Sequence, residues 1–257
     1  EFNDNIGNWT VSNVTNMSNM FFNAYDFNRY IGDWNVSNVT NMSNMFLDAR
    51  AFNQPIGNWQ VYNVTSMTQM FQTSDNFNQD ISGWNVSNVT SMRAMFVQSE
   101  KFNQPIGNWN VAKVADMNNM FFNSQFNQPI RDWDVANVTI MANMFDGSPF
   151  NQDIRVWDVS SNAILSNMFS NAPIMTTYNV TATPPLSFFA KVFTNGGDHD
   201  IHTLVNDWIQ NPQDNKFQLP GNRPYYGSIE NWDVANVTNM SLLFYNKQNF
   251  NDDISGW

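Results

Sequence analysis

The chain has 257 residues and a formal net charge of −11, with only 11 lysine and arginine residues. These bases are scattered singly, so the sequence lacks the basic patch that nucleic acid or an anionic membrane requires. Cysteine is absent, which excludes disulfides, thiol catalysis and cysteine-ligated metals. No apolar run is long enough to cross a bilayer.

Tryptophan recurs at a nearly fixed interval. Successive tryptophans are 25 residues apart from Trp9 to Trp109, 24 apart up to Trp157, and again 25 apart at Trp232 and Trp257. Other apolar residues keep the same period, and around Trp34 they are Phe27, Ile31, Val36, Val39, Met42, Met45 and Phe46. A unit of this size cannot bury these side chains alone. The copies must therefore stack around one long core. The tryptophans could form an exposed sugar-stacking ladder, but their place beside Ile and Val predicts burial.

Within each unit the spacing of the apolar residues changes from the first half to the second. Residues 31–36 end in a period of two with aromatic and β-branched side chains, which predicts a short strand. Residues 39–49 have apolar side chains at helical spacing, with Thr40 or Asn41 as the cap. We therefore predict an α/β repeat solenoid, a right-handed coil of 24–25 residues with a short parallel strand plus a short helix. Equivalent Asn side chains are expected to form hydrogen-bonded ladders between coils.

Along the chain, residues 1–171 form a first array of about seven coils, residues 172–227 a linker and capping helix, and residues 228–257 the start of a second array. A helix beginning after Asp200 is expected to cover the open core of the second array. Its apolar face consists of Ile201, Leu204, Val205, Trp208 and Ile209. Because the sequence starts and stops inside a repeat, we expect it to be a piece of a longer polypeptide.

The sequence contains few candidates for catalytic or metal-binding residues. His199 and His202 lie beside aspartates, which are metal-ligand types, but a loop leading into a capped helix explains the same residues and is the favoured interpretation. Asp80 and Asp153 share a repeat position with Pro55, which predicts a surface turn and not a pair of catalytic acids. We therefore expect no enzymatic activity, no metal and no cofactor.

Asn-x-Ser/Thr sequons recur because the repeat contains V-S-N-V-T, in which Asn and Thr serve turn and cap. Asn179 lies outside the template and is the candidate glycosylation site. Residues that depart from the template are the candidates for partner contact, namely Tyr30, Tyr62, Arg93, Lys113 and Arg155.

The repeat F-N-Q-[PD]-I-[GS]-[NG]-W-[ND]-V-S-N-V-T-[NS]-M-x-x-M-F resembles that of the BspA-like leucine-rich-repeat surface proteins, also called the mycoplasma lipoprotein-type 25-residue repeat. The spacing of Ile31, Trp34 and Val36 is similar to L-x-x-L-x-L, and the match covers most of residues 1–171 and 228–257. The segment I-H-T-L-V-N-D-W-I-Q resembles the lead-in to arrays in these proteins. The resemblance implies adhesion or host interaction at a cell surface, and such arrays also occur in marine protists and large DNA viruses.

The sequence leaves three hypotheses. The first is a non-enzymatic extracellular or surface-exposed scaffold that contacts other proteins, including copies of itself, within a filament, appendage, or virion or cell surface layer. The second is an adhesin that recognises a protein or glycan through the variable surface residues. The third is a calcium-stabilised solenoid, which a chelator would destabilise. None involves nucleic acid or membrane insertion.

Overall fold

The computed structural model describes residues 2–189, 191–192, 201–202, 205, 229, 232–234, 237, 239–247, 250–251 and 254–256. The elements whose bounds these residues define are α1 (Ile174–Thr177), a 3-10 helix η1 (Leu186–Phe189), β1 (Lys191–Val192) and β2 (Trp232–Asp233). Residues 201, 202 and 205 are also helical. β1 and β2 pair in parallel, with Lys191 opposite Trp232. None of these helices has the length and hydropathy of a membrane span.

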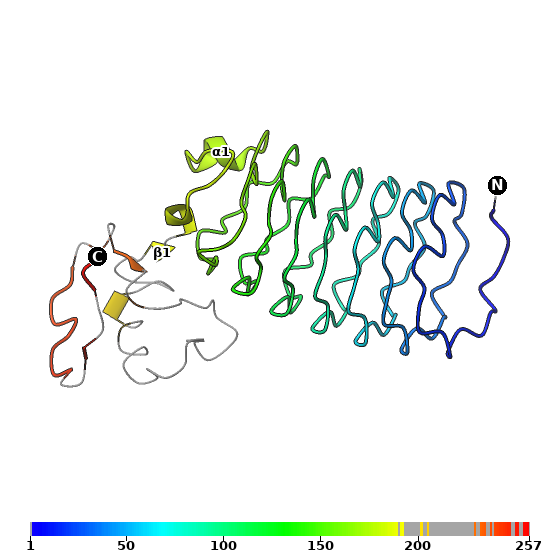
Figure 1. Ribbon diagram of the computed structural model, residues 1–257, viewed down its shortest axis with the longest axis horizontal. Coiled ribbons are helices and arrows are strands. Elements are labelled where there is room, and N and C mark those ends of the chain that lie inside the picture. The colour runs from blue at the N-terminus through cyan, green and yellow to red at the C-terminus, as the bar shows by residue number, and fades with distance from the viewer. Residues whose placement is uncertain are drawn as a thin grey trace.

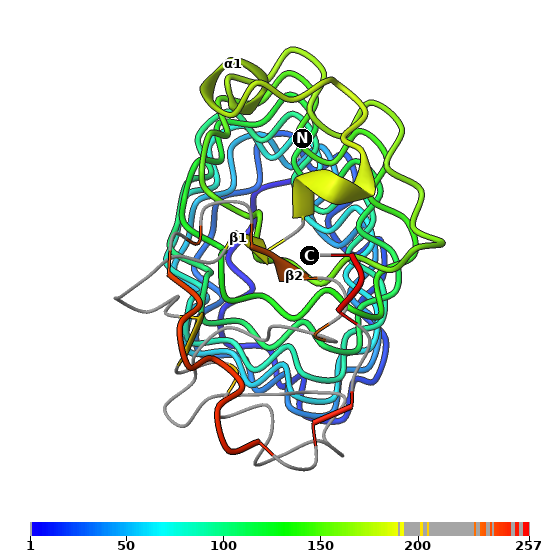
Figure 2. The ribbon, with the colours of Figure 1, turned by 90° about the vertical axis from the view of Figure 1, so that its left-hand side faces the viewer.

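Residues 2–171 wind into coils that lie side by side (Figure 1). Parallel bridges join one residue of each coil to its equivalent in the next, in the order Asn16, Asn41, Ser66, Ser91, Asp116, Ile140 and Ile164. Viewed from one end, successive coils enclose a common interior (Figure 2). A single cluster of buried apolar residues runs from Ile6 to Phe189, as expected for a unit too small to bury its own apolar side chains.

The predicted strand and helix of each coil are wrong. Up to residue 173 the structure contains isolated bridges and turns, but no regular strand or helix. Apolar residues three apart are the two ends of tight turns: the Trp34 N–H donates to the Ile31 carbonyl at 3.2 Å, and the Met45 N–H donates to the Met42 carbonyl at 3.2 Å. The fold is therefore not the α/β, leucine-rich-repeat type of coil expected from the I-x-x-W-x-V spacing.

Hydrogen bonds between coils replace those of the predicted helix. A helix would bond each N–H to the carbonyl four residues earlier in the same segment. Instead, the N–H groups of Met42 and Asn44 donate to Ser66 and Thr68 in the next coil, at 3.1 and 2.8 Å. Asn44 has φ +57°, a left-handed conformation that interrupts a helix and that Asn tolerates well. Two left-handed residues recur in each coil, at Asn19 and Asn23, Asn44 and Asp48, Gln69 and Thr73, Ala94 and Gln98, Asn119 and Asn123, Asn143 and Gly147, and Asn167 and Asn171.

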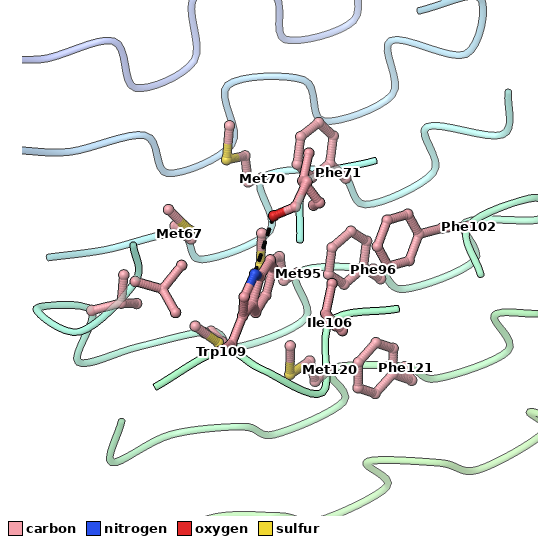
Figure 3. Packing of buried hydrophobic residues seen from close by; sticks show 14 of the residues in the cluster. Met67, Met70, Phe71, Met95, Phe96, Phe102, Ile106, Trp109, Met120 and Phe121 are labelled. Carbon is pink, nitrogen blue, oxygen red and sulfur yellow. Dashed lines mark hydrogen bonds between the residues drawn. The ribbon is translucent and has the colours of Figure 1, made fainter. Parts of the chain in front are cut away.

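The core consists of aromatic and methionine columns that run along the stack (Figure 3). Phe96 lies 5.7 Å from Phe121 in the next coil with nearly parallel rings, and 3.9 Å from Phe102 in the turn that follows it. Trp109 is buried, and its indole N–H donates to the carbonyl of Ile81 in the preceding coil at 3.1 Å. The same bond recurs from Trp34 to Trp157. The prediction that the tryptophans are buried is thus confirmed from Trp34 to Trp157; Trp9, in the first coil, is 52% exposed.

Asparagine ladders reinforce the stack. The Oδ1 atom of Asn28 accepts the Asn53 N–H at 3.0 Å, and the Oδ1 atom of Asn53 accepts the Asn78 N–H at 3.0 Å. Gln79 Nε2 also donates to Asn53 Oδ1, at 2.9 Å. A direct bond between two Asn side chains occurs at Asn44 and Asn19. The expected bond between equivalent Asn side chains is confirmed at Asn44 and Asn19, whereas the continuous ladder joins each Asn side chain to the backbone of the next coil.

Residues 172–189 close the end of the first array. The Phe169 N–H donates to the Ala182 carbonyl at 2.8 Å, and the Asn167 N–H donates to Thr183 Oγ1 at 2.8 Å. The Phe188 ring packs edge-on against Phe169 at 5.4 Å. These bonds use N–H groups that would otherwise bond to an eighth coil. The sequence predicts a linker here, and nothing in its pattern indicates that these residues cap the first array.

A second buried cluster contains Ile201 and Val205, two residues of the predicted capping face, together with Ile229, Val234 and Leu243. Leu204, Trp208 and Ile209 lie outside the described residues, as does His199. That this segment covers the second array therefore stays a prediction.

Candidate binding face

The outward side chains of one segment in each coil form a continuous polar surface. In residues 35–40, Val36 and Val39 point into the core and are buried, while Asn35, Asn38 and Thr40 are exposed. We define the amide face as the outward side chains of the five equivalent segments, residues 10–15, 35–40, 60–65, 85–90 and 110–115.

We call a row of side chains at the same repeat position in successive coils a file. The amides of one file on this face donate hydrogen bonds to the preceding coil. Asn38 Nδ2 donates to the Ser12 carbonyl at 2.8 Å, and Asn63 Nδ2 donates to the Ser37 carbonyl at 2.8 Å. Because a carbonyl must accept from the amide nitrogen, these bonds fix the orientation of each amide and turn its Oδ1 away from the bond. This file therefore presents hydrogen-bond acceptors in fixed positions.

A neighbouring file has the reverse orientation. Asn35 Oδ1 accepts the N–H of Ser37 at 3.1 Å, and Asn85 Oδ1 accepts the N–H of Ser87 at 3.1 Å. The Nδ2 groups of Asn35 and Asn85 donate to no other group among the described residues. Asn35 and Asn85 thus present donors, and Asn38 and Asn63 present acceptors. Gln60, between Asn35 and Asn85, differs because its Nε2 donates to the Asn58 carbonyl at 3.2 Å.

Two of the predicted contact residues, Tyr62 and Lys113, lie on this face two coils apart. Asn88 lies between them: its Nδ2 donates to the Tyr62 carbonyl at 2.8 Å, and its Oδ1 accepts from Lys113 Nζ at 2.7 Å. Tyr62 is 40% exposed, so its ring is available to a ligand. Sequence reasoning selected both residues as departures from the repeat but had no means of placing them on one face.

The amide face differs in charge from the rest of the molecule. Its five segments contain no Asp or Glu, and Lys113 is their only charged residue, although the whole chain carries −11. Acidic residues occupy the equivalent position in the last two coils of the first array, at Asp134 and Asp158, and in the second array, at Asp233. The face is therefore close to neutral and suits an uncharged polar ligand better than an anion or a cation.

The other three predicted contact residues lie elsewhere. Tyr30 is 45% exposed, but its hydroxyl donates to Asp33 Oδ1 at 2.8 Å, a hydrogen bond that raises the pKa of Tyr30. Arg93 is exposed in the turn after Met92. Since Tyr30, Arg93 and Arg155 belong to different parts of the coil from residues 60–65, the five residues do not form one site.

Arg155 belongs to a charged cluster at the capped end. It forms two hydrogen bonds with Asp153, at 3.0 and 3.2 Å, and lies over the Tyr178 ring at 4.9 Å. Arg131 is 3.6 Å from the same carboxylate. Burial acts to raise the pKa of Asp153, but the hydrogen bonds and charge of Arg155, with Arg131, outweigh it and hold that pKa below its usual value. These pairs join coils six and seven to the cap, which indicates a structural role.

Asn179 lies in the cap, exposed and with φ +50°. The hydroxyl of Thr181, the third residue of its sequon, donates to the Thr183 carbonyl at 2.6 Å. By contrast, the Nδ2 atoms of the sequon residues Asn38, Asn63, Asn88 and Asn137 are bonded to the preceding coil. Glycosylation of Asn179 stays a prediction.

Among the described residues, no group of three His, Asp or Glu side chains is arranged to hold a metal ion. His202 Nε2 lies 3.0 Å from the Ser241 carbonyl.

The repeat identifies the family. The Mycoplasma protein family of unknown function DUF285 matches residues 1–106, 76–182 and 214–257. The chain belongs to this family. Comparison with curated proteins and with solved structures gives no match.

Membership in DUF285 agrees with the mycoplasma part of the resemblance described above. The family's function is unknown, so its match carries no activity, ligand or partner to this chain.

Proposed function

We propose that this chain is a non-enzymatic, surface-exposed repeat scaffold that makes protein–protein contacts within a larger assembly. The observation that carries this proposal is the unbroken core from Ile6 to Phe189. Each coil is tied to the next by backbone bonds, an Asn ladder and stacked rings. Such a stack is stiff and presents the same side-chain files at regular intervals, as a structural subunit requires.

We infer an extracellular location, on a cell surface or a virion, from the resemblance to BspA-like surface proteins. The uniform coils favour a structural component because most surface positions repeat without change. The partners would be copies of this chain or other subunits of the same layer, filament or appendage.

Electron microscopy of the protein purified from its native source tests this proposal. Ordered filaments or layers with the stack at subunit contacts are the expected result. Cross-linking followed by mass spectrometry would then map the contacts to particular files. Isolated rods that cross-link to no other copy or subunit would contradict the proposal.

A second candidate function is an adhesin. It is favoured by the position of Tyr62 and Lys113 on either side of Asn88, because this group of departures from the repeat lies on an otherwise neutral amide face. Alanine at both positions should abolish ligand binding and leave assembly intact. Loss of assembly without loss of binding would favour the scaffold.

A further inference from the structure

We propose that the amide face binds a neutral polysaccharide, with the Tyr62 ring as its stacking platform. This inference rests on the second candidate function and names its ligand class.

The first argument is the pairing of donors and acceptors. A sugar hydroxyl both donates and accepts hydrogen bonds, so a glycan needs both kinds of partner in fixed positions. Asn35 and Asn85 present Nδ2 donors because their Oδ1 atoms are used by backbone N–H groups. Asn38 and Asn63 present Oδ1 acceptors because their Nδ2 atoms are used by carbonyls. Since these amides are already held in place, a ligand orders few side chains on binding.

The second argument is the position of the exposed aromatic ring. Tyr62 takes the place of Ser37 and Ser87 in the neighbouring coils, between the donor file and the acceptor file. Tyrosine combines an apolar ring face with a polar hydroxyl, which suits the mixed C–H and O–H surface of a sugar ring. Gln60 and Asn85 are exposed beside it. A sugar stacked on Tyr62 would therefore have amides on both sides.

The third argument is charge. The five segments of the face contain no carboxylate and one lysine, whose Nζ is bonded to Asn88. An anionic polysaccharide would find only this one cation, and a basic partner would find no anion. A neutral chain laid along the stack would meet the donors of Asn35 and Asn85 and the acceptors of Asn38 and Asn63 in coils two to four.

Native gel electrophoresis of the full chain tests the proposal, with hydroxyethylcellulose, laminarin or galactomannan cast into the gel. We expect at least one of these neutral polysaccharides to retard the protein, and alginate, which is anionic, to retard it less. Retardation should persist at about 0.5 M salt, because salt at this concentration screens charge interactions within a few ångströms but does not weaken binding between uncharged groups. Tyr62→Ala should weaken the interaction by about tenfold, the loss typical of one aromatic stacking contact.

Two variants serve as controls. Tyr62→Phe keeps the ring and should retain binding. Tyr30→Ala removes a similarly exposed tyrosine away from the face and should also retain binding. The proposal is overturned if none of the neutral polysaccharides retards the chain, if alginate alone does, or if Tyr62→Ala and Tyr30→Ala behave alike. These outcomes do not bear on the scaffold proposal, because electron microscopy tests assembly independently. If the chain instead captured a protein ligand in a Tyr62-dependent manner, the adhesin function would stand and the polysaccharide ligand would be rejected.

Discussion

At the scale of single residues, the Asn ladder makes one side chain responsible for two hydrogen bonds from the next coil. Asn53 Oδ1 accepts both the Asn78 N–H and Gln79 Nε2. Asn53→Ala should lower the free energy of unfolding by about 1–3 kcal/mol, because it leaves partly buried donors without an acceptor. Urea unfolding followed by tryptophan fluorescence measures the change. Asn108→Ala, at an exposed position, should stay within about 0.5 kcal/mol of wild type; equal effects would show that the ladder does not stabilise the stack.

Two carboxylates should respond to pH in opposite ways. The depressed pKa of Asp153 stabilises the fold above about pH 4, and this stabilisation is lost as the pH falls through its folded-state pKa. Burial and the neighbouring Glu100 raise the pKa of Asp75, so its charged form destabilises the fold at neutral pH and protonation relieves the cost.

Thermal melts between pH 3 and 7 check both effects. At pH 7, Asp153→Asn should lower the Tm and Asp75→Asn should raise it, and both differences from wild type should shrink toward pH 3. Differences of the same sign at pH 7 would contradict the assigned causes.

At the scale of the coil, the left-handed positions impose local strain. Thr73 has φ +55°, which is costly for a β-branched residue. Thr73→Asn should raise the free energy of unfolding by about 0.5–1 kcal/mol, because Asn tolerates this conformation. Thr10→Asn, an exposed site outside the left-handed region, should be neutral. Stabilisation by both, or by neither, would mean that backbone strain at Thr73 is small.

The sequence revealed the period, the shared core and the ladders, but not the path of the backbone. A spacing of three between Met42 and Met45, followed by Phe46, is common to a helix and to consecutive turns. The distinguishing signal was local: Asn44 lies between the two methionines, and Asp48 follows two residues after Phe46. Without the true path, the outward positions of residues 60–65 and 110–115 could not be assigned to one face, so Tyr62 and Lys113 remained separate candidates.

At the scale of the whole molecule, the cap should control how the first array opens. Phe188→Ala together with Phe189→Ala removes the rings packed at the end of the core. The amides of Asn167 and Phe169 should then exchange with solvent at least about tenfold faster, while those of coil three, such as Phe71, should not change, because contacts in a repeat stack are between neighbours. Hydrogen exchange with mass spectrometry measures both. Uniform acceleration along the array would instead indicate a single cooperative unit.

The backbone hydrogen bonds between coils also give the stack a net dipole moment along its axis. Between the second and third coils, the N–H groups of Met42, Asn44, Phe46 and Asp48 all point toward the capped end, and the carbonyls that they meet point back. Peptide dipoles aligned in this way add along an axis, as they do in a helix. Two backbone bonds between the same coils run the other way, from Thr65 to Thr40 and from Asn76 to Arg50, so the four forward bonds outnumber them. The peptide groups of the stack therefore leave a net dipole that is positive at coil seven and negative at coil one, although the coils contain no helix. A field or a charged surface would orient it lengthwise, one end first.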